Sequence, residues 1–205
     1  MLDFLIRLSV MSKGLIPFMA VIFLASLAAI AERLYFFAKT LRAGESIEHD
    51  IKLMRHGNRE DLEKIQQHYA DTIQVPLVQA ALATREEDAE SMDRRIEEAA
   101  MWQYPLLDRN LWVVDTAVTL GPLLGLLGTI IGMIESFAIL DKVGSGNPAA
   151  VTGGIANALI ATALGLSIAI VSLIFLNYFR KRLQLSLHQL DLIKTMLINR
   201  LHGAA

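Results

Sequence analysis

The stretch that decides the fold is residues 151–179, VTGGIANALIATALGLSIAIVSLIFLNYF. It contains no Asp, Glu, Lys or Arg, and it is longer than the roughly 20 apolar residues that a helix needs to cross a bilayer. Because helices in lipid associate through close packing of small side chains, a stripe of small residues predicts contact with another helix. Such a stripe recurs here every three or four positions: Ala158, Ala161, Gly165, Ala169 and Ser172.

Two side chains with hydrogen-bonding groups, Asn157 and Thr162, lie in the same span. In hydrocarbon such groups need a protein partner or a water-filled cavity. We therefore expect this helix to face other helices around a polar space.

The composition is that of a membrane protein and excludes several other classes. Of the 205 residues, 54% are hydrophobic, and the mean hydropathy is +0.44. The net charge of −2 gives no basic field for nucleic acid. The absence of cysteine excludes disulfides and thiolate metal sites, and the five histidines have no metal-ligand spacing. We expect no metal and no cofactor.

A first span is predicted at residues 14–37, which end in the interfacial aromatic residues Tyr35, Phe36 and Phe37. Residues 1–13 mix apolar and basic side chains, which predicts a short amphipathic segment at the membrane surface. A cleaved signal peptide is the alternative. It is disfavoured because the apolar stretch is too long and no clear small-residue cleavage site follows.

A second span is predicted within residues 111–140, LWVVDTAVTLGPLLGLLGTIIGMIESFAIL. One face carries glycines spaced four, three and four apart, which is a pattern of close helix packing: Gly121, Gly125, Gly128 and Gly132. Thr129 adjoins that face, and Glu135 lies about 7 Å from the outer end by helical rise. Asp115 is expected to project into water.

The polar middle of the chain is predicted to be helical, with turns or helix starts at residues 44–46, 57–58 and 75–76. After Pro76 the apolar spacing predicts one long helix with a charged opposite face. The carboxylates at residues 86–98 suggest an acid–base site as an alternative, but a solvated helix face is the favoured interpretation.

The positive charges near the spans set the orientation. The loop between spans two and three has one lysine, whereas Lys and Arg gather at the other ends of the spans, so those ends are expected to be cytoplasmic. The basic cluster Arg180–Arg182 ends the third span, and an amphipathic helix is expected to follow. The expected order is a periplasmic segment (1–13), span one (14–37), a cytoplasmic helical domain (38–112), span two (113–140), a periplasmic loop (141–150), span three (151–179) and a cytoplasmic helix (180–205).

The polar groups within the spans allow little chemistry. No nucleophile–base pair or phosphate loop is visible, so an enzyme is not expected. Thr129 and Thr162 can bond their own helix backbone instead of a ligand, and Glu135 can reach the headgroups. With no acid at mid-span, a partner must supply any group that carries a proton.

Two motifs carry a family resemblance. GPLLGLLGTIIGMIESF (121–137) and GGIANALIATALGLSIAI (153–170) resemble the ExbB/TolQ/MotA family of bacterial inner-membrane proton channels, as does the segment Leu107–Asn110 before span two. The resemblance implies a homopentameric ring with spans two and three around a pore. It also implies two copies of a single-span ExbD- or TolR-like subunit, whose aspartate carries the proton past Thr129 and Thr162. A TonB- or TolA-like protein would receive the work in the periplasm or outer membrane.

The sequence departs from this family at two positions of span three. ExbB and TolQ typically have Glu where this chain has Asn157, and an amide cannot titrate. Val171 stands where the family commonly has a proline, so span three is expected to lack the kink that this proline would cause. A non-conducting membrane scaffold therefore stands beside the proton channel as an alternative. A membrane enzyme has only the acidic residues 86–98 in its favour.

Overall fold

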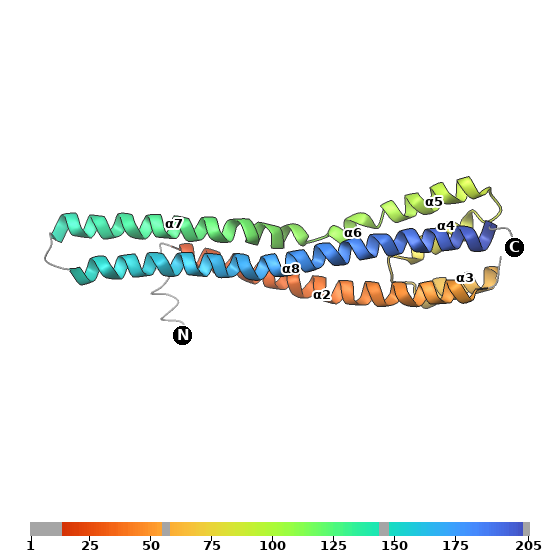
Figure 1. Cartoon of the computed structure of the whole chain (residues 1–205), viewed down its shortest axis with the longest axis horizontal. Helices are drawn as coiled ribbons and strands as arrows, with labels where there is room; N and C mark the ends of the chain where they lie inside the picture. Colours follow the sequence, from red (N-terminus) through yellow and green to blue (C-terminus); the bar gives the residue numbers. More distant parts are fainter. Residues whose placement is uncertain (1–13, 55–57, 144–147, 203–205) are drawn as a thin grey trace. The chain divides into compact units, whose positions relative to one another are not determined.

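The structure is a computed structural model that describes residues 14–54, 58–143 and 148–202, and within these ranges it is helical without strands. The predicted surface segment 1–13 and part of the predicted loop 141–150 lie outside the described residues. Figure 1 shows the helices: α2 (Leu15–Leu53), α3 (Arg59–His68), α4 (Val75–Ala83), α5 (Ala89–Met101), α6 (Tyr104–Asp108), α7 (Leu111–Val143) and α8 (Pro148–His202). Three helices of this described part are long and apolar enough to cross a membrane. The prediction of an all-helical membrane protein is confirmed to that extent.

The chain forms two compact units. The first consists of the chain up to Glu32 together with Asn110–Tyr178, and the second of Arg33–Arg109 together with the chain from Phe179. Helices α2 and α8 are each continuous and contribute to both units. The apolar parts of α2, α7 and α8 make the first unit, and the polar helices belong to the second.

In the first unit, α2 packs against both α7 and α8. Met19 of α2, Ala117 of α7 and Ile168 of α8 are buried together. Farther along α2, the buried hydroxyls of Ser26 and Ser172 form a hydrogen bond of 3.0 Å. In a span such a bond satisfies both hydroxyls and fixes α2 against α8.

In the second unit, an aromatic contact joins α2 to α8, and a polar contact joins α2 to the start of α4. The rings of Phe37 and Phe179 stack with centroids 6.0 Å apart. Gln74 Nε2 donates to the Thr40 carbonyl over 3.0 Å. Each contact lies among buried side chains, so this unit has an interior of its own.

An ion pair joins α5 to α8 in the same unit. Lys194 Nζ lies 3.0 Å from Asp93 Oδ1 and 2.7 Å from Glu97 Oε2. The burial of Lys194 alone would lower its pKa, but the hydrogen bonds and charges of Glu97 and Asp93 outweigh burial and raise the pKa. Most of the acidic residues predicted to form a solvated face are exposed, whereas Asp93 and Glu97 are half-buried and bind Lys194.

The predicted turn at residues 44–46 is wrong, because these residues lie inside α2. Gly44 is buried where α2 meets α8, and a Cβ at this position would overlap the Gln189 side chain. The glycine serves close helix approach instead of a turn.

The predicted single helix after Pro76 is also wrong. It is two helices, because α4 ends at Ala83 and α5 begins at Ala89. Asp88 caps α5: its carboxylate accepts hydrogen bonds from the Ser91 amide at 3.3 Å and the Ser91 hydroxyl at 2.6 Å. Two other predicted helix starts are confirmed, since Asn58 caps α3 and Val75–Pro76 opens α4.

Candidate ion pathway on the α7–α8 pair

The glycine face of α7 and the small-residue face of α8 lie directly against each other, and the two helices run antiparallel in Figure 1. A Cβ at Gly121 would lie 2.7 Å from the Gly165 carbonyl oxygen. A Cβ at Gly132 would lie 2.7 Å from the Ala158 Cβ. These distances are shorter than ordinary van der Waals contact, so larger side chains cannot be accommodated without moving the helices apart.

Thr162 joins the two helices by a hydrogen bond. Its hydroxyl donates to the Gly125 carbonyl of α7 over 2.9 Å. The Thr129 hydroxyl instead donates to the Leu126 carbonyl of its own helix over 2.6 Å. The own-helix interpretation therefore describes Thr129 but not Thr162. Both hydroxyl oxygens keep lone pairs that can accept a further hydrogen bond.

The two threonines lie on the same side of the α7–α8 pair. At 100° per residue, Thr129 is turned about 70° from the centre of the glycine face of α7, and Thr162 about 60° from the centre of the small face of α8. Because both are turned in the same sense and the helices are antiparallel, both point to one side.

Glu135 and Asn157 lie on the opposite side of the pair. By the same construction they are turned about 50° and 80° in the other sense. The four residues predicted as a proton pathway therefore divide into two pairs. Thr129 and Thr162 lie on one side of the two helices, and Glu135 and Asn157 lie on the other.

Helix α2 covers the Glu135 side. Ala117 and Leu124 of α7 and Ile168 of α8, which pack with Met19, are turned in the same sense as Glu135 and Asn157. The threonine side thus faces away from α2. Large apolar side chains surround it and are about half exposed in the single chain: Leu126, Met133, Leu159 and Leu166. This side is available to another helix.

Sequence reasoning missed two serines that contact the spans. Ser26 bonds Ser172 across helices, and Ser136 donates to the Gly132 carbonyl over 2.8 Å. The Ser136 hydroxyl fills the space beside Gly154, where a Cβ would overlap it. An isolated serine in an apolar window was the available signal for both.

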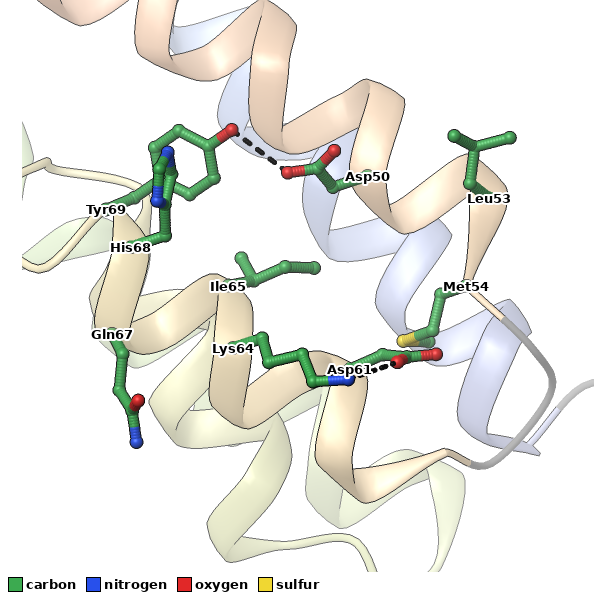
Figure 2. A pocket seen from close by; sticks show the side chains of 9 residues that line it. All are labelled: Asp50, Leu53, Met54, Asp61, Lys64, Ile65, Gln67, His68 and Tyr69. Carbon is green, nitrogen blue, oxygen red and sulfur yellow. Dashed lines mark hydrogen bonds and ion pairs between the residues drawn. The ribbon is translucent and has the colours of Figure 1, made fainter.

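The second unit contains an open groove of about 820 Å³ between the end of α2 and α3, shown in Figure 2. Its charged groups already have partners. The Tyr69 hydroxyl donates to Asp50 Oδ2 over 2.9 Å, and Lys64 Nζ lies 3.7 Å from Asp61 Oδ1. Burial and the bond to Asp50 raise the pKa of Tyr69. No pair of carboxylates converges here, so the groove does not support acid–base catalysis. Among the described residues, no cluster of His, Asp or Glu could hold a metal ion.

Comparison with known proteins gives one consistent result. The model of the MotA/TolQ/ExbB proton channel family matches residues 45–191. The ExbB-like 3 protein of Synechocystis sp. is 36% identical over 174 residues, which cover 83% of this chain and 81% of that protein. The biopolymer transport protein ExbB of Aquifex aeolicus is 37% identical over 78 residues, 38% of this chain and 53% of that protein. ExbB of Salmonella typhimurium is 35% identical over 92 residues, 45% of this chain and 36% of that protein.

Proposed function

Because the chain belongs to the MotA/TolQ/ExbB proton channel family, we propose that it is the stator subunit of a proton-driven motor in the bacterial inner membrane. In this proposal it couples the proton motive force to work in the periplasm or outer membrane. The observation that carries the proposal is the position of Thr129 and Thr162 on one side of the α7–α8 pair, away from α2. A pore lined by α7 and α8 needs polar groups on that side and not on the side that α2 covers.

The proposed assembly is a homopentamer that encloses the single span of an ExbD- or TolR-like subunit, in two copies. The exposed apolar side chains around the threonines support this assembly, because a span can leave them to lipid or to other helices. A TonB- or TolA-like protein is the proposed receiver of the work. The N-terminus lies in the periplasm and the C-terminus in the cytoplasm, as the distribution of Lys and Arg favours.

The proposed chemistry follows from the donors and acceptors. Thr162 gives its hydrogen to the Gly125 carbonyl, so its oxygen is oriented to accept a hydrogen bond from outside the pair. A protonated aspartate of the partner subunit is a suitable donor. Neither α7 between Asp115 and Glu135 nor α8 from Thr152 to Tyr178 has an acidic residue, so the partner carries the titrating group. Glu135 and Asn157 take a secondary place in this pathway because they lie on the other side.

The test is proton flux into liposomes that contain the chain and its single-span partner. Thr162→Val is expected to lower the flux at least tenfold, whereas Thr162→Ser keeps the hydroxyl and most of the flux. The matched control is Ser167→Ala, since the Ser167 hydroxyl is exposed and bonds the Ala163 carbonyl of its own helix. Loss of one interhelical hydrogen bond costs only about 0.6 kcal/mol on average in a membrane, so the complex is expected to assemble. Unchanged flux in Thr162→Val would refute the pathway.

A second variant in the same flux assay compares the contribution of Asn157 with that of Thr162. Asn157→Asp is expected to change the flux less than Thr162→Val, because Asn157 is turned toward the α2 side. The reverse order would show that Asn157 is the key group and that the threonine side is not the pathway.

The alternative function is a scaffold of the same architecture that conducts no protons. Two observations favour it: the Thr129 hydroxyl is bonded to its own helix, and Asn157 replaces the glutamate typical of ExbB and TolQ. Assembly of the wild-type complex without measurable flux would select this alternative.

A further inference from the structure

The junction of α5 and α6 exposes three large apolar side chains, which we call the aromatic elbow: Met101 at 54%, Trp102 at 72% and Leu106 at 43% exposed. Gln103 between them and the flanking residues Ala100 and Leu107 are buried, so they form the inner side of the elbow. Its outer side is exposed among the residues that the structure describes.

A buried arginine connects the elbow to the end of the apolar stretch of α2. Arg33 is 1% exposed, and its Nη1 donates to the Leu106 carbonyl over 3.0 Å. Its guanidinium also lies 4.4 Å from the centre of the Phe36 ring. In the continuous helix α2, the apolar stretch ends with Ala31, and the charged residues Glu32 and Arg33 follow it. Leu106 thus lies beside the residue at which the span of α2 ends.

The span of α8 ends at the same level within this unit. Phe37 stacks on Phe179, and the next residues of α8 are Arg180 and Lys181, both exposed. Lys39 and Arg109 are exposed as well, and Asp108 is an exposed carboxylate among these cations. At the ends of the spans these cations outnumber the exposed carboxylates Glu32 and Asp108. The carboxylates whose charges act on Tyr104 of the elbow, Glu97 and Asp191, lie farther from the span ends along α5 and α8.

The dimensions match a headgroup layer. Trp102 precedes Leu106 by four residues, so helical rise takes it at most about 6 Å farther from the end of the apolar stretch. The polar layer of each leaflet is roughly 5–8 Å thick. Tyr35, next to Phe36 on α2, is 75% exposed at the same level. Trp and Tyr with an apolar body and a polar edge are the side chains enriched in this layer.

We propose that the aromatic elbow is a membrane anchor seated among anionic lipid headgroups, with Trp102 in the headgroup layer and Arg109 and Lys181 beside the phosphates. The apolar spans enter the bilayer at this level, and the exposed cations complement anionic lipid. The anchor holds the cytoplasmic end of the chain against the membrane, independently of whether the channel conducts.

The experiment measures fluorescence quenching of the full chain in phosphatidylcholine–phosphatidylglycerol vesicles that carry brominated lipid. The chain has two tryptophans, so Trp112→Phe leaves Trp102 alone. Leu27→Trp, in the chain without both native tryptophans, is the membrane reference, because Leu27 lies in the apolar stretch of α2 and is 36% exposed. Leu53→Trp, in the chain without both native tryptophans, is the water reference, because Leu53 is 71% exposed and lies about 30 Å beyond Arg33 along α2.

We expect brominated lipid to quench Trp102 at least half as strongly as the tryptophan at position 27, and to leave the tryptophan at position 53 unquenched. Quenching of Trp102 no stronger than at position 53 would overturn the proposal. In that case, quenching by acrylamide identifies what surrounds Trp102 instead of lipid. Quenching of Trp102 by acrylamide shows that it is in water, and protection shows that a neighbouring subunit covers it. Omitting phosphatidylglycerol should weaken the quenching of Trp102. This loss of quenching should be smaller in the double variant Arg109→Gln/Lys181→Gln, which lacks the two cations. Quenching independent of phosphatidylglycerol would overturn the assignment to anionic headgroups.

Discussion

Replacement of Gly121 by alanine tests whether the α7–α8 contact is as close as the structure has it. The added Cβ would lie 2.7 Å from the Gly165 carbonyl oxygen and 3.3 Å from the Ala169 amide nitrogen. Both atoms belong to the backbone of α8, so they cannot rotate away as a side chain could. The matched control is Gly153→Ala, in α8, where a Cβ meets nothing within 4 Å.

The expected magnitude follows from two opposing terms. Both variants gain helix propensity, up to about 1 kcal/mol for Gly to Ala. Only Gly121→Ala must also open the contact by about 0.7 Å to reach ordinary contact at 3.4 Å, and such overpacking costs about 1–3 kcal/mol. Because the propensity gain largely cancels between the two variants, Gly121→Ala should be about 1–3 kcal/mol less stable than Gly153→Ala.

The assay is reversible unfolding of the purified chain by SDS in mixed micelles, followed by loss of helical circular dichroism. Gly153→Ala should unfold at or above the SDS fraction of the wild type, and Gly121→Ala clearly below it. Equal unfolding midpoints for the two variants would refute the close approach of α7 and α8, and with it the assignment of which face of each helix is inward.

Two further predictions concern the second unit. Asn58→Ala removes the side-chain oxygen that accepts the Glu60 amide at 3.1 Å; it should cost about 1 kcal/mol and speed amide exchange in α3 about fivefold, with Asn199→Ala in α8 as a control that leaves α3 unchanged. Lys194→Met removes the ion pairs with Asp93 and Glu97, so the wild type should be the more stable protein at neutral pH. Because the pKa of Lys194 is raised in the folded chain, this excess stability should be full below its unfolded pKa near 10.5 and vanish as the pH rises through the folded value. An excess that persists at high pH would contradict the ion-pair explanation.

The sequence predicted the spans well because the bilayer restricts what can cross it. A spanning segment must satisfy its own backbone and expose apolar side chains, so length and composition nearly suffice. The break between α4 and α5 was not predicted, because a stripe of buried residues shows which side chains point inward and not whether the helix is continuous. The missed signal was Asp88, whose carboxylate caps α5. Gly44 was misread as a turn because its role depends on Gln189, which is distant in sequence.

The candidate site was predicted as a set of residues but not as an arrangement. Thr129, Thr162, Asn157 and Glu135 are the polar groups of the two motifs, and the sequence alone identifies them. Which of their two sides faces away from α2 depends on how α2 packs on the pair, and nothing in the apolar pattern of α2 predicts that. The buried contact of Met19 with Ala117 and Ile168 supplies this information.

The position of α2 constrains any ring of subunits. If the threonine side of α7 and α8 faces a central partner, α2 must lie on the outer side of the ring, where it meets lipid. Its side chains agree with this arrangement, because Val21 and Leu24, on the face of α2 opposite Met19, are 62% and 65% exposed and wholly apolar. In the proposed ring the same chain presents hydroxyls inward and hydrocarbon outward, and the proposed partner supplies the carboxylate that faces the hydroxyls.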